Sequence, residues 1–186
     1  MSVESTSPFR MARPKRRIRF DVAIIVAALV AIVLTLLVMT SAHARQLATF
    51  DTYPAGTIVI KTTQRQLFLA LGNGTAIQYP VAVGKDGKRW SGIAHVDGKY
   101  IRPAWAPPEE VRRDHPELGL IQGGAPNNPM GERALTLDRD QIAIHGTNRP
   151  NSIGTFASYG CIRMFNADII DLFDRVKVGT QVVVLP

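Results

Sequence analysis

The sequence predicts a mostly β domain, of sandwich or barrel type, with one helix near the C-terminus and an apolar membrane-inserting segment in front of it. Three observations support this fold class. Short β-branched segments alternate with turn residues from position 57 onward. Helical spacing of apolar residues is clear at 167–176, and an uncharged apolar run occupies residues 22–39. The length of 186 residues allows one domain with an appendage.

The first strands form an antiparallel meander. Residues 57–62 and 66–71 are β-branched or apolar and show period-2 alternation. A Gly-Asn-Gly turn at 72–74 follows, because glycine and asparagine tolerate positive φ. The third strand is expected at 75–83 and ends in a turn at 84–87.

Residues 90–131 are expected to form a long loop, with a short helix at 109–113 after two prolines. Long ordered loops in compact domains are usually functional, so this one is expected to cover or shape a substrate cleft. Two further strands are predicted at 134–137 and 141–144.

The C-terminal part is predicted to contain the domain's one good helix. Asn166 is expected to cap a helix over 167–176, whose apolar residues would bury one face. Residues 181–185 (QVVVL) read as a final, central strand.

The N-terminal region predicts export. Residues 1–21 are a basic tail expected in the cytoplasm, and residues 22–40 contain the apolar run, whose 18 uncharged residues would form a helix of roughly 27 Å. Ala42-His43-Ala44 has the small-x-small form that signal peptidase reads, so a signal peptide cut after Ala44 competes with an uncleaved anchor. The length of the run favours the anchor. Residues 41–56 are expected to be a linker and 57–186 an exported domain.

Composition and charge exclude several classes of protein. The 22 Lys+Arg and 15 Asp+Glu residues give +7, but +4 of this lies in residues 1–44, ahead of the exported part. No nucleic-acid partner is therefore expected. A single cysteine and four scattered histidines offer neither a disulfide nor a spaced metal-ligand set, so no metal site is predicted.

The only cysteine, Cys161, is the candidate nucleophile. An unpaired thiol in an oxidising compartment is a liability unless it is used or buried as a small apolar residue. Ser158 and Gly160 favour a tight turn that displays the thiol. Arg163 would share a face with Cys161 in an extended segment, and a nearby cation favours the thiolate. His145 ends a predicted strand and is the candidate base.

These residues resemble the L,D-transpeptidase catalytic domain (the YkuD type). The resemblance covers roughly residues 56–186 and is carried by His-Gly-Thr at 145–147, Ser-x-Gly-Cys-Ile-Arg-Met at 158–164, and the closing helix and strand. Two departures are present. Tyr159 replaces a histidine found in many members, and Trp90-Ser91-Gly92-Ile93 stands where members often have Thr-Pro-x-Gly.

The resemblance implies the family's catalytic fold and cysteine acyl transfer on peptidoglycan tetrapeptide stems in the cell envelope, with D-alanine released and 3-3 cross-links formed. It implies no cofactor, and contact with the cytoplasmic membrane would run through residues 22–39. The implied roles are Cys161 as nucleophile, His145 as base, Gly146 as the carbonyl that orients the imidazole, backbone N–H groups of Tyr159, Gly160 and Cys161 as oxyanion donors, and Arg163, Ser158 and Thr147 as substrate-binding or loop-orienting residues.

Two alternatives remain open on the sequence. An L,D-carboxypeptidase would use the same site with water as acceptor. The other alternative is a non-catalytic wall-binding domain, in which Tyr159 would mark the loss of activity. The sequence does not distinguish among a stem peptide, a lipoprotein, a D-amino acid and water as the acyl acceptor.

Overall fold

The computed structural model describes residue 26 and residues 45–50, 53–139 and 141–186. The chain divides into two compact units, Met1–Ala42 and His43–Pro186. The predicted tail and membrane segment, apart from Val26, lie outside the described residues, as does part of the linker. Among the described residues, no helix has both the length and the apolar character needed to cross a membrane.

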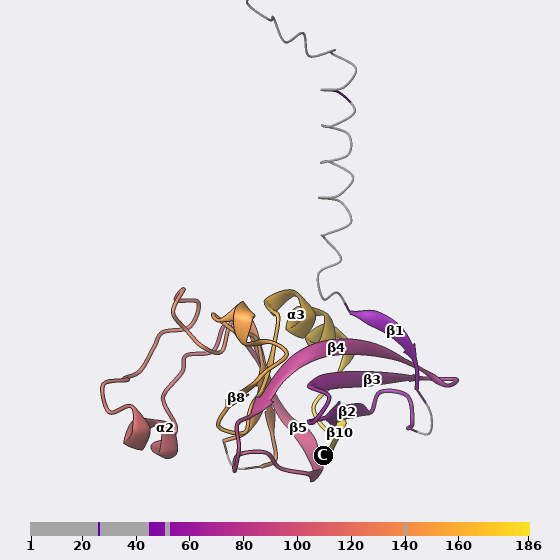
Figure 1. Ribbon diagram of the computed structural model, residues 1–186, viewed down its shortest axis with the longest axis horizontal. Coiled ribbons are helices and arrows are strands. Elements are labelled where there is room, and N and C mark those ends of the chain that lie inside the picture. The colour runs from indigo at the N-terminus through magenta and orange to yellow at the C-terminus, as the bar shows by residue number, and fades with distance from the viewer. Residues whose placement is uncertain (1–25, 27–44, 51–52, 140) are drawn as a thin grey trace, which may run out of the picture. The chain divides into compact units, whose positions relative to one another are not determined.

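The second unit is mostly β, which confirms the predicted fold class (Figure 1). Its elements in chain order are β1 (Gln46–Thr49), β2 (Ile58–Lys61), β3 (Gln66–Gly72), β4 (Thr75–Gly84), β5 (Gly92–Ile101), α2 (Glu109–Asp114), β6 (Arg133–Leu137), β7 (Ala143–His145), the 3-10 turn η1 (Pro150–Ser152), β8 (Phe156–Ser158), β9 (Ile162–Met164), α3 (Asn166–Arg175) and β10 (Gln181–Leu185).

The strands form a sheet that closes on itself. Neighbours follow the order β1-β4-β3-β2-β10-β5-β6-β7-β9, and β9 also pairs with β4. Because β4 pairs with both β3 and β9, the path from β4 to β9 makes a barrel-like ring. The predicted meander is present as antiparallel β2, β3 and β4. The predicted central position of the last strand is confirmed, since β10 lies between β2 and β5.

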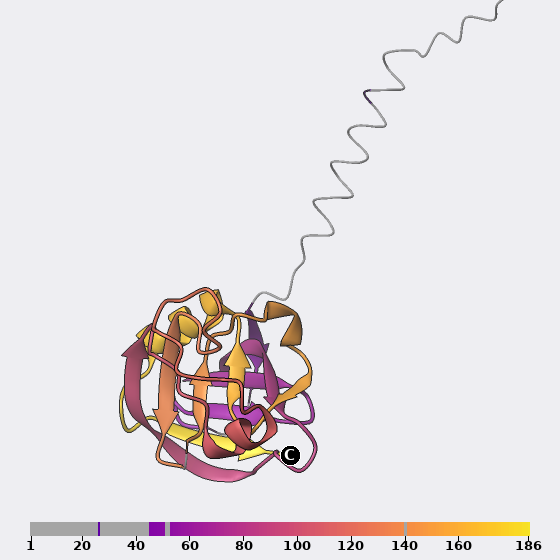
Figure 2. The same ribbon diagram turned by 90° about the vertical axis from the view of Figure 1, so that its left-hand side faces the viewer.

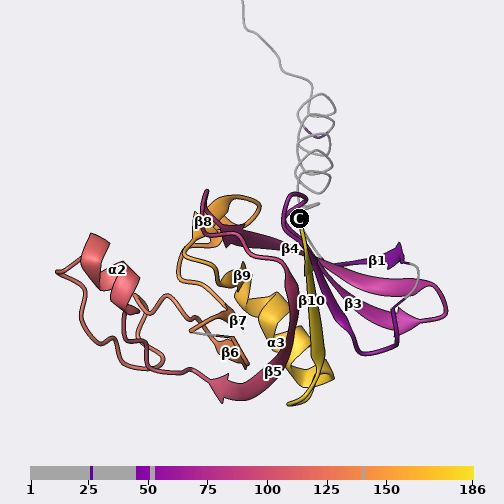
Figure 3. The same ribbon diagram turned by 90° about the horizontal axis from the view of Figure 1, so that it is seen from below.

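The core fills the inside of this ring. Alternate residues of the meander, such as Ile58, Ile60 and Leu67, join Ile169 and Leu172 of α3 in one buried apolar cluster. Helix α3 packs against β6 and β7, as Figure 3 shows. Burial of this apolar surface is the main stabilising term for the strands that carry the site.

The predicted strict alternation of burial does not hold in β2 and β3. Val59 and Phe68 lie on the outer face of the meander, yet they are buried. A second apolar cluster covers them, to which Phe50 and Tyr53 contribute, and Phe50 stacks on Phe68 with ring centroids 4.6 Å apart. The expected linker therefore includes a strand, β1, and covers one face of the sheet with its aromatic residues.

The expected loop over 90–131 also contains a ten-residue strand, β5. Only Ala94 and Val96 of this strand are well buried, and charged residues occupy several other positions, so its apolar signal is short. Pairing with β10 on one side and β6 on the other stabilises it instead. The predicted short helix is confirmed as α2, which lies on the side of the molecule facing the viewer in Figure 2.

Two predicted boundaries near the site are wrong. Gln141 has φ of 53° and lies in a turn, so β7 begins at Ala143 and ends at His145. The N-cap of α3 is Phe165, and Asn166 is the first helical residue. The Asn166 side chain makes tertiary hydrogen bonds instead of capping the helix, and these bonds bear on the site described next.

Candidate active site

Two short parallel strands bring the candidate base and nucleophile together. In the β7–β9 pair, Ile144 is opposite Ile162 and His145 is opposite Arg163. Cys161 immediately precedes β9, two residues before Arg163, so the extended chain places both on the face that His145 shares. Cys161, His145 and Arg163 all line one cavity of about 400 Å³.

The loop after β5 forms the opposite wall of this cavity. Trp105, Pro108 and Glu109 line it, and they also line a second cavity of about 590 Å³ that contains His145 and Cys161. The predicted role of this loop in shaping a cleft is thus seen in the structure. Ion pairs fasten α2 to the β4–β5 turn, between Lys88 and Glu110 and between Lys85 and Asp114.

His145 is held as a neutral imidazole. Its side chain is buried, and Nδ1 lies 2.7 Å from the carbonyl oxygen of Gly146. Burial, followed by the charge of Arg163, lowers the pKa of His145 to about 4, while the backbone groups of Gly146 and Pro129 act in the opposite direction. A neutral ring that donates from Nδ1 to a carbonyl carries its free electron pair on Nε2. His145 is therefore prepared to accept a proton at that atom.

Cys161 is half-buried and rests as a thiol. Its Sγ lies 3.6 Å from the carbonyl oxygen of Gln141, to which the S–H donates. Burial raises the pKa of Cys161, and this effect exceeds the opposing ones of the Ala143 backbone and the Arg163 charge. Arg163 thus favours the thiolate, as the sequence predicted, but it does not offset burial.

The turn before Cys161 is set by Ser158 and Gly160. The Ser158 hydroxyl donates to the carbonyl of Cys161 at 2.5 Å and accepts the Gly160 N–H at 3.1 Å. Gly160 has φ of 122°, and a Cβ there would lie 2.8 Å from Cδ1 of Ile142. The positive φ is what favours glycine here, because Cδ1 of Ile142 is the end of a flexible side chain and can shift.

The candidate oxyanion donors are not equivalent. The N–H of Gly160 is engaged by Ser158, whereas the N–H groups of Tyr159 and Cys161 have no acceptor among residues that the structure describes. Tyr159 and Cys161, which carry these two N–H groups, both line the cavity of about 400 Å³.

Thr147 and Arg163 differ in their position relative to the cavity. Thr147 is buried and does not line the cavity, and its hydroxyl accepts the N–H of Arg149 at 3.0 Å, within the loop after His145. Arg163 lines the cavity, and within the described parts of the chain its side chain makes no hydrogen bond or ion pair. In these parts of the chain, no hydrogen bond of the Arg163 side chain supports the loop-holding role.

Asn166 is a site residue that the sequence did not identify as one. Its Oδ1 accepts the N–H groups of Glu132 and Thr147 at 3.2 and 3.1 Å, and its Nδ2 donates to the Thr147 carbonyl at 3.1 Å. The turn carrying Gly146 is thereby tied to the loop before β6. The available signal is the position of Asn166 directly after Met164 and Phe165, which the sequence pattern assigns to a helix cap instead.

Comparison with known proteins agrees with this geometry. The family model described as "L,D-transpeptidase catalytic domain" (YkuD) matches residues 55–184. The chain belongs to this family.

The relatives show how far the likeness extends. The probable L,D-transpeptidase YbiS of Escherichia coli K12 is 34% identical over 146 residues, covering 74% of this chain and 47% of that protein. The chain thus spans about half the length of this relative. The structure of L,D-transpeptidase 3 from Mycobacterium tuberculosis covers 74% of this chain and 63% of that one with a TM-score of 0.57 at 16% identity, which supports the fold.

One solved structure has a different kind of name. A Brucella melitensis protein called a probable carnitine operon oxidoreductase is 41% identical, covers 80% of this chain and 97% of that one, and has a TM-score of 0.53. This chain nevertheless belongs to the L,D-transpeptidase family, whose model matches residues 55–184.

Proposed function

We propose that this chain is a cell-wall L,D-transpeptidase that uses Cys161 as its nucleophile. The observation that carries the proposal is the placement of a neutral, oriented imidazole and a thiol on one face of the β7–β9 pair, in one cavity. Membership of the family supports peptidoglycan as the substrate, and we take its stem peptides as the part that reacts.

The first half of the reaction forms a thioester. Nε2 of His145 takes the proton from the thiol as Sγ of Cys161 attacks the carbonyl at the L-centre of the third stem residue, diaminopimelate. The bond to the terminal D-alanine breaks, and the His145 proton passes to the leaving amine. The oxyanion that forms in between accepts hydrogen bonds from the N–H groups of Tyr159 and Cys161.

The second half transfers the acyl group. An amine from another stem attacks the thioester, His145 takes a proton from that amine, and the thiol is restored as the new amide forms. When a second diaminopimelate supplies the amine, the product is a 3-3 cross-link. Arg163 contributes by pairing with a carboxylate of the anionic stem, for which its place in the cavity wall is suited.

Intact-mass analysis after incubation with a carbapenem tests the nucleophile. We expect one covalent adduct on the native chain, located at Cys161, and none on Cys161→Ala. Cys161→Ser is the matched variant, since it keeps the size of the side chain and loses the easily ionised sulfur. An adduct on the alanine variant would show that the nucleophile is another residue.

Products from purified tetrapeptide stems separate the transpeptidase from its alternatives. Cross-linked dimers are expected by mass spectrometry. Tripeptides alone would mean an L,D-carboxypeptidase, and stem binding with no labelling of Cys161 by an electrophile would mean a wall-binding domain.

We further propose that residues 22–39 hold the protein at the outer side of the cytoplasmic membrane. The uncharged run and the basic residues before it support this placement. N-terminal sequencing of the protein from membrane fractions tests it. A mature chain beginning at Arg45 would mean that the segment is a cleaved signal peptide.

A further inference from the structure

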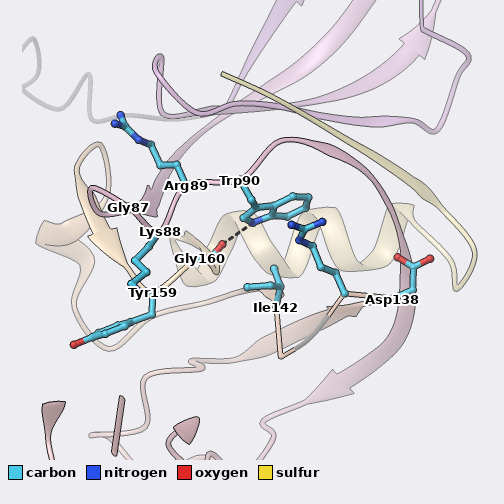
Figure 4. Close-up of a pocket in the computed structure, with 9 residues that line it drawn as sticks. Gly87, Lys88, Arg89, Trp90, Asp138, Ile142, Tyr159 and Gly160 are labelled. Atoms are coloured by element: carbon cyan, nitrogen blue, oxygen red, sulfur yellow. Dashed lines mark hydrogen bonds between the residues drawn. The ribbon is translucent and has the colours of Figure 1, made fainter. Parts of the chain in front are cut away.

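Trp90 contacts the cysteine loop from a cavity other than those that Cys161 lines. It lies between β4 and β5, and its indole Nε1–H donates to the carbonyl oxygen of Gly160 at 3.0 Å (Figure 4). Trp90 and Gly160 line a third cavity, of about 630 Å³, which Cys161 does not line. Cys161 in turn lines the cavities that contain His145. The peptide joining Gly160 to Cys161 therefore stands in the wall between two hollows.

The planarity of that peptide couples its two ends. None of the described peptide bonds is cis, and in a trans peptide the C=O of one residue and the N–H of the next point in opposite directions. A hydrogen bond that fixes the Gly160 carbonyl on the Trp90 side thus turns the Cys161 N–H away from Trp90, toward the side that holds the thiol.

This peptide needs an external restraint. Gly160 has no Cβ and a positive φ, so its own backbone does little to resist rotation of the peptide plane. The hydrogen bonds of Ser158 hold the Gly160 N–H and the Cys161 carbonyl, which belong to the two neighbouring peptides. Among the described residues, the Trp90 indole is the one hydrogen-bonding partner of the peptide between them.

The indole is itself held in place. Trp90 packs against the edge of the main core cluster. The guanidinium of Arg139 lies over its ring, 4.5 Å from the centroid. Ile142, which limits the space beside Gly160, lines the same cavity, and Figure 4 shows it near the Trp90 ring.

We propose that Trp90 is a positioning residue, whose indole N–H orients the Gly160–Cys161 peptide so that the Cys161 N–H is ready to receive the oxyanion. The inference rests on the proposed function, because an oxyanion forms only if Cys161 attacks a carbonyl. Trp90 touches neither substrate nor thiol in this role. It acts through the backbone alone.

Trp90→Phe tests the proposal, since it keeps an aromatic ring and removes the donor. Two rate constants are measured on the folded protein: acylation by a carbapenem, which passes through an oxyanion, and alkylation by iodoacetamide, which needs the thiolate but no oxyanion donor. We expect acylation to fall by about 10- to 100-fold, below the roughly 10²- to 10³-fold loss seen when a donor is removed outright, with alkylation unchanged. A role limited to packing or to thiol reactivity would change both rates together.

Tyr79→Phe is the matched control. It also removes one aromatic donor from the core, the hydroxyl bound to Asp171 at 2.6 Å, but on the side of α3. Its acylation rate per folded molecule is expected to equal that of the native chain. If Trp90→Phe does not fold, Arg139→Gln replaces it, because a loosened indole must again lower acylation more than alkylation.

The outcomes separate the two proposals. Equal acylation of the native and Trp90→Phe chains, or an equal fall in both rates, would overturn the role of Trp90 while leaving the cysteine mechanism intact. A native chain that iodoacetamide modifies but a carbapenem does not acylate would overturn the proposed function, and the role of Trp90 with it.

Discussion

The hydroxyl of Tyr159 donates a hydrogen bond to Oδ2 of Asp114 at 2.6 Å, and this bond joins the cysteine loop to the last residue of helix α2. The Nζ of Lys85 lies 3.7 Å from the centroid of the Tyr159 ring and 3.8 Å from Oδ2 of Asp114. Tyr159, Asp114 and Lys85 therefore connect the cysteine loop to helix α2, which lines the cavity containing Cys161.

Removing this hydroxyl is expected to loosen α2. In Tyr159→Phe the ring and its contact with Lys85 remain, and an exposed hydrogen bond to a charged group is lost, so α2 opens more often. Hydrogen exchange of residues 105–114 measures this opening. Asp114→Asn must show the same direction, and the double variant must show less than the sum of the two effects. Additive effects would mean that the two side chains act independently.

The acid limb of the acylation rate should report the low pKa of His145. The base form of His145 is required, and its pKa of about 4 keeps it unprotonated well below the ordinary 6.5. Carbapenem acylation measured from neutral pH downward should hold its level and fall with a midpoint near 4. A midpoint near 6.5 would show that the imidazole is more exposed to water in solution than in this structure.

Arg163 should shift that midpoint in a known direction. Its charge lowers the pKa of His145 and also lowers that of Cys161. Replacing Arg163 with glutamine must therefore raise the pKa of both His145 and Cys161. The acid midpoint of acylation then moves upward, and the pH at which iodoacetamide reacts moves further above 9. A lower acid midpoint of acylation, or reaction with iodoacetamide at a lower pH, would contradict the placement of the Arg163 guanidinium. Thr147→Ser, which keeps the loop hydroxyl and lies outside the cavity, serves as the neutral comparison.

The sequence located the chemical groups better than it located their supports. His145 and Gly146 stand in one short motif and Cys161 in another, and the resemblance of both motifs to the transpeptidase family singles these residues out without knowledge of the fold. The bond from Trp90 to Gly160 spans 70 positions, and the bonds from Asn166 span 34 and 19. Contacts of that range depend on which strands become neighbours, and local patterns do not encode that information.

The errors in the fold have a related cause. The sequence predicts a loop where β5 lies because the residues there alternate little in polarity, yet β5 is held by ladders to β6 and β10 that form only in the closed sheet. β8 and β9 have three residues each, too few for any period to show. Tertiary pairing overrides weak local preference at such places.

Asn166 should contribute to stability in proportion to the backbone groups it satisfies. Asn166→Ala leaves the N–H groups of Glu132 and Thr147 and the Thr147 carbonyl without their side-chain partner, which costs about 2–4 kcal/mol in the free energy of unfolding. Asn166→Asp keeps the acceptor and loses only the donor, so its loss should be smaller. Urea denaturation measures both. Equal stability of the alanine variant and the native chain would show that water replaces these bonds without cost.

Gly160 and Gly87 provide a matched pair for separating backbone strain from the site. Both have positive φ, 122° and 73°, but a Cβ at Gly87 meets nothing within 4 Å, whereas one at Gly160 lies 2.8 Å from Ile142. Each alanine variant should lose about 1–2 kcal/mol of stability from the conformation alone. Only Gly160→Ala should also lower carbapenem acylation, because relief of the backbone strain at residue 160 displaces the peptide that carries the Cys161 N–H. Thermal unfolding and acylation rates together decide the matter, since a Gly87→Ala chain that lost acylation to the same degree would show that turn strain anywhere near β4 disturbs the nucleophile.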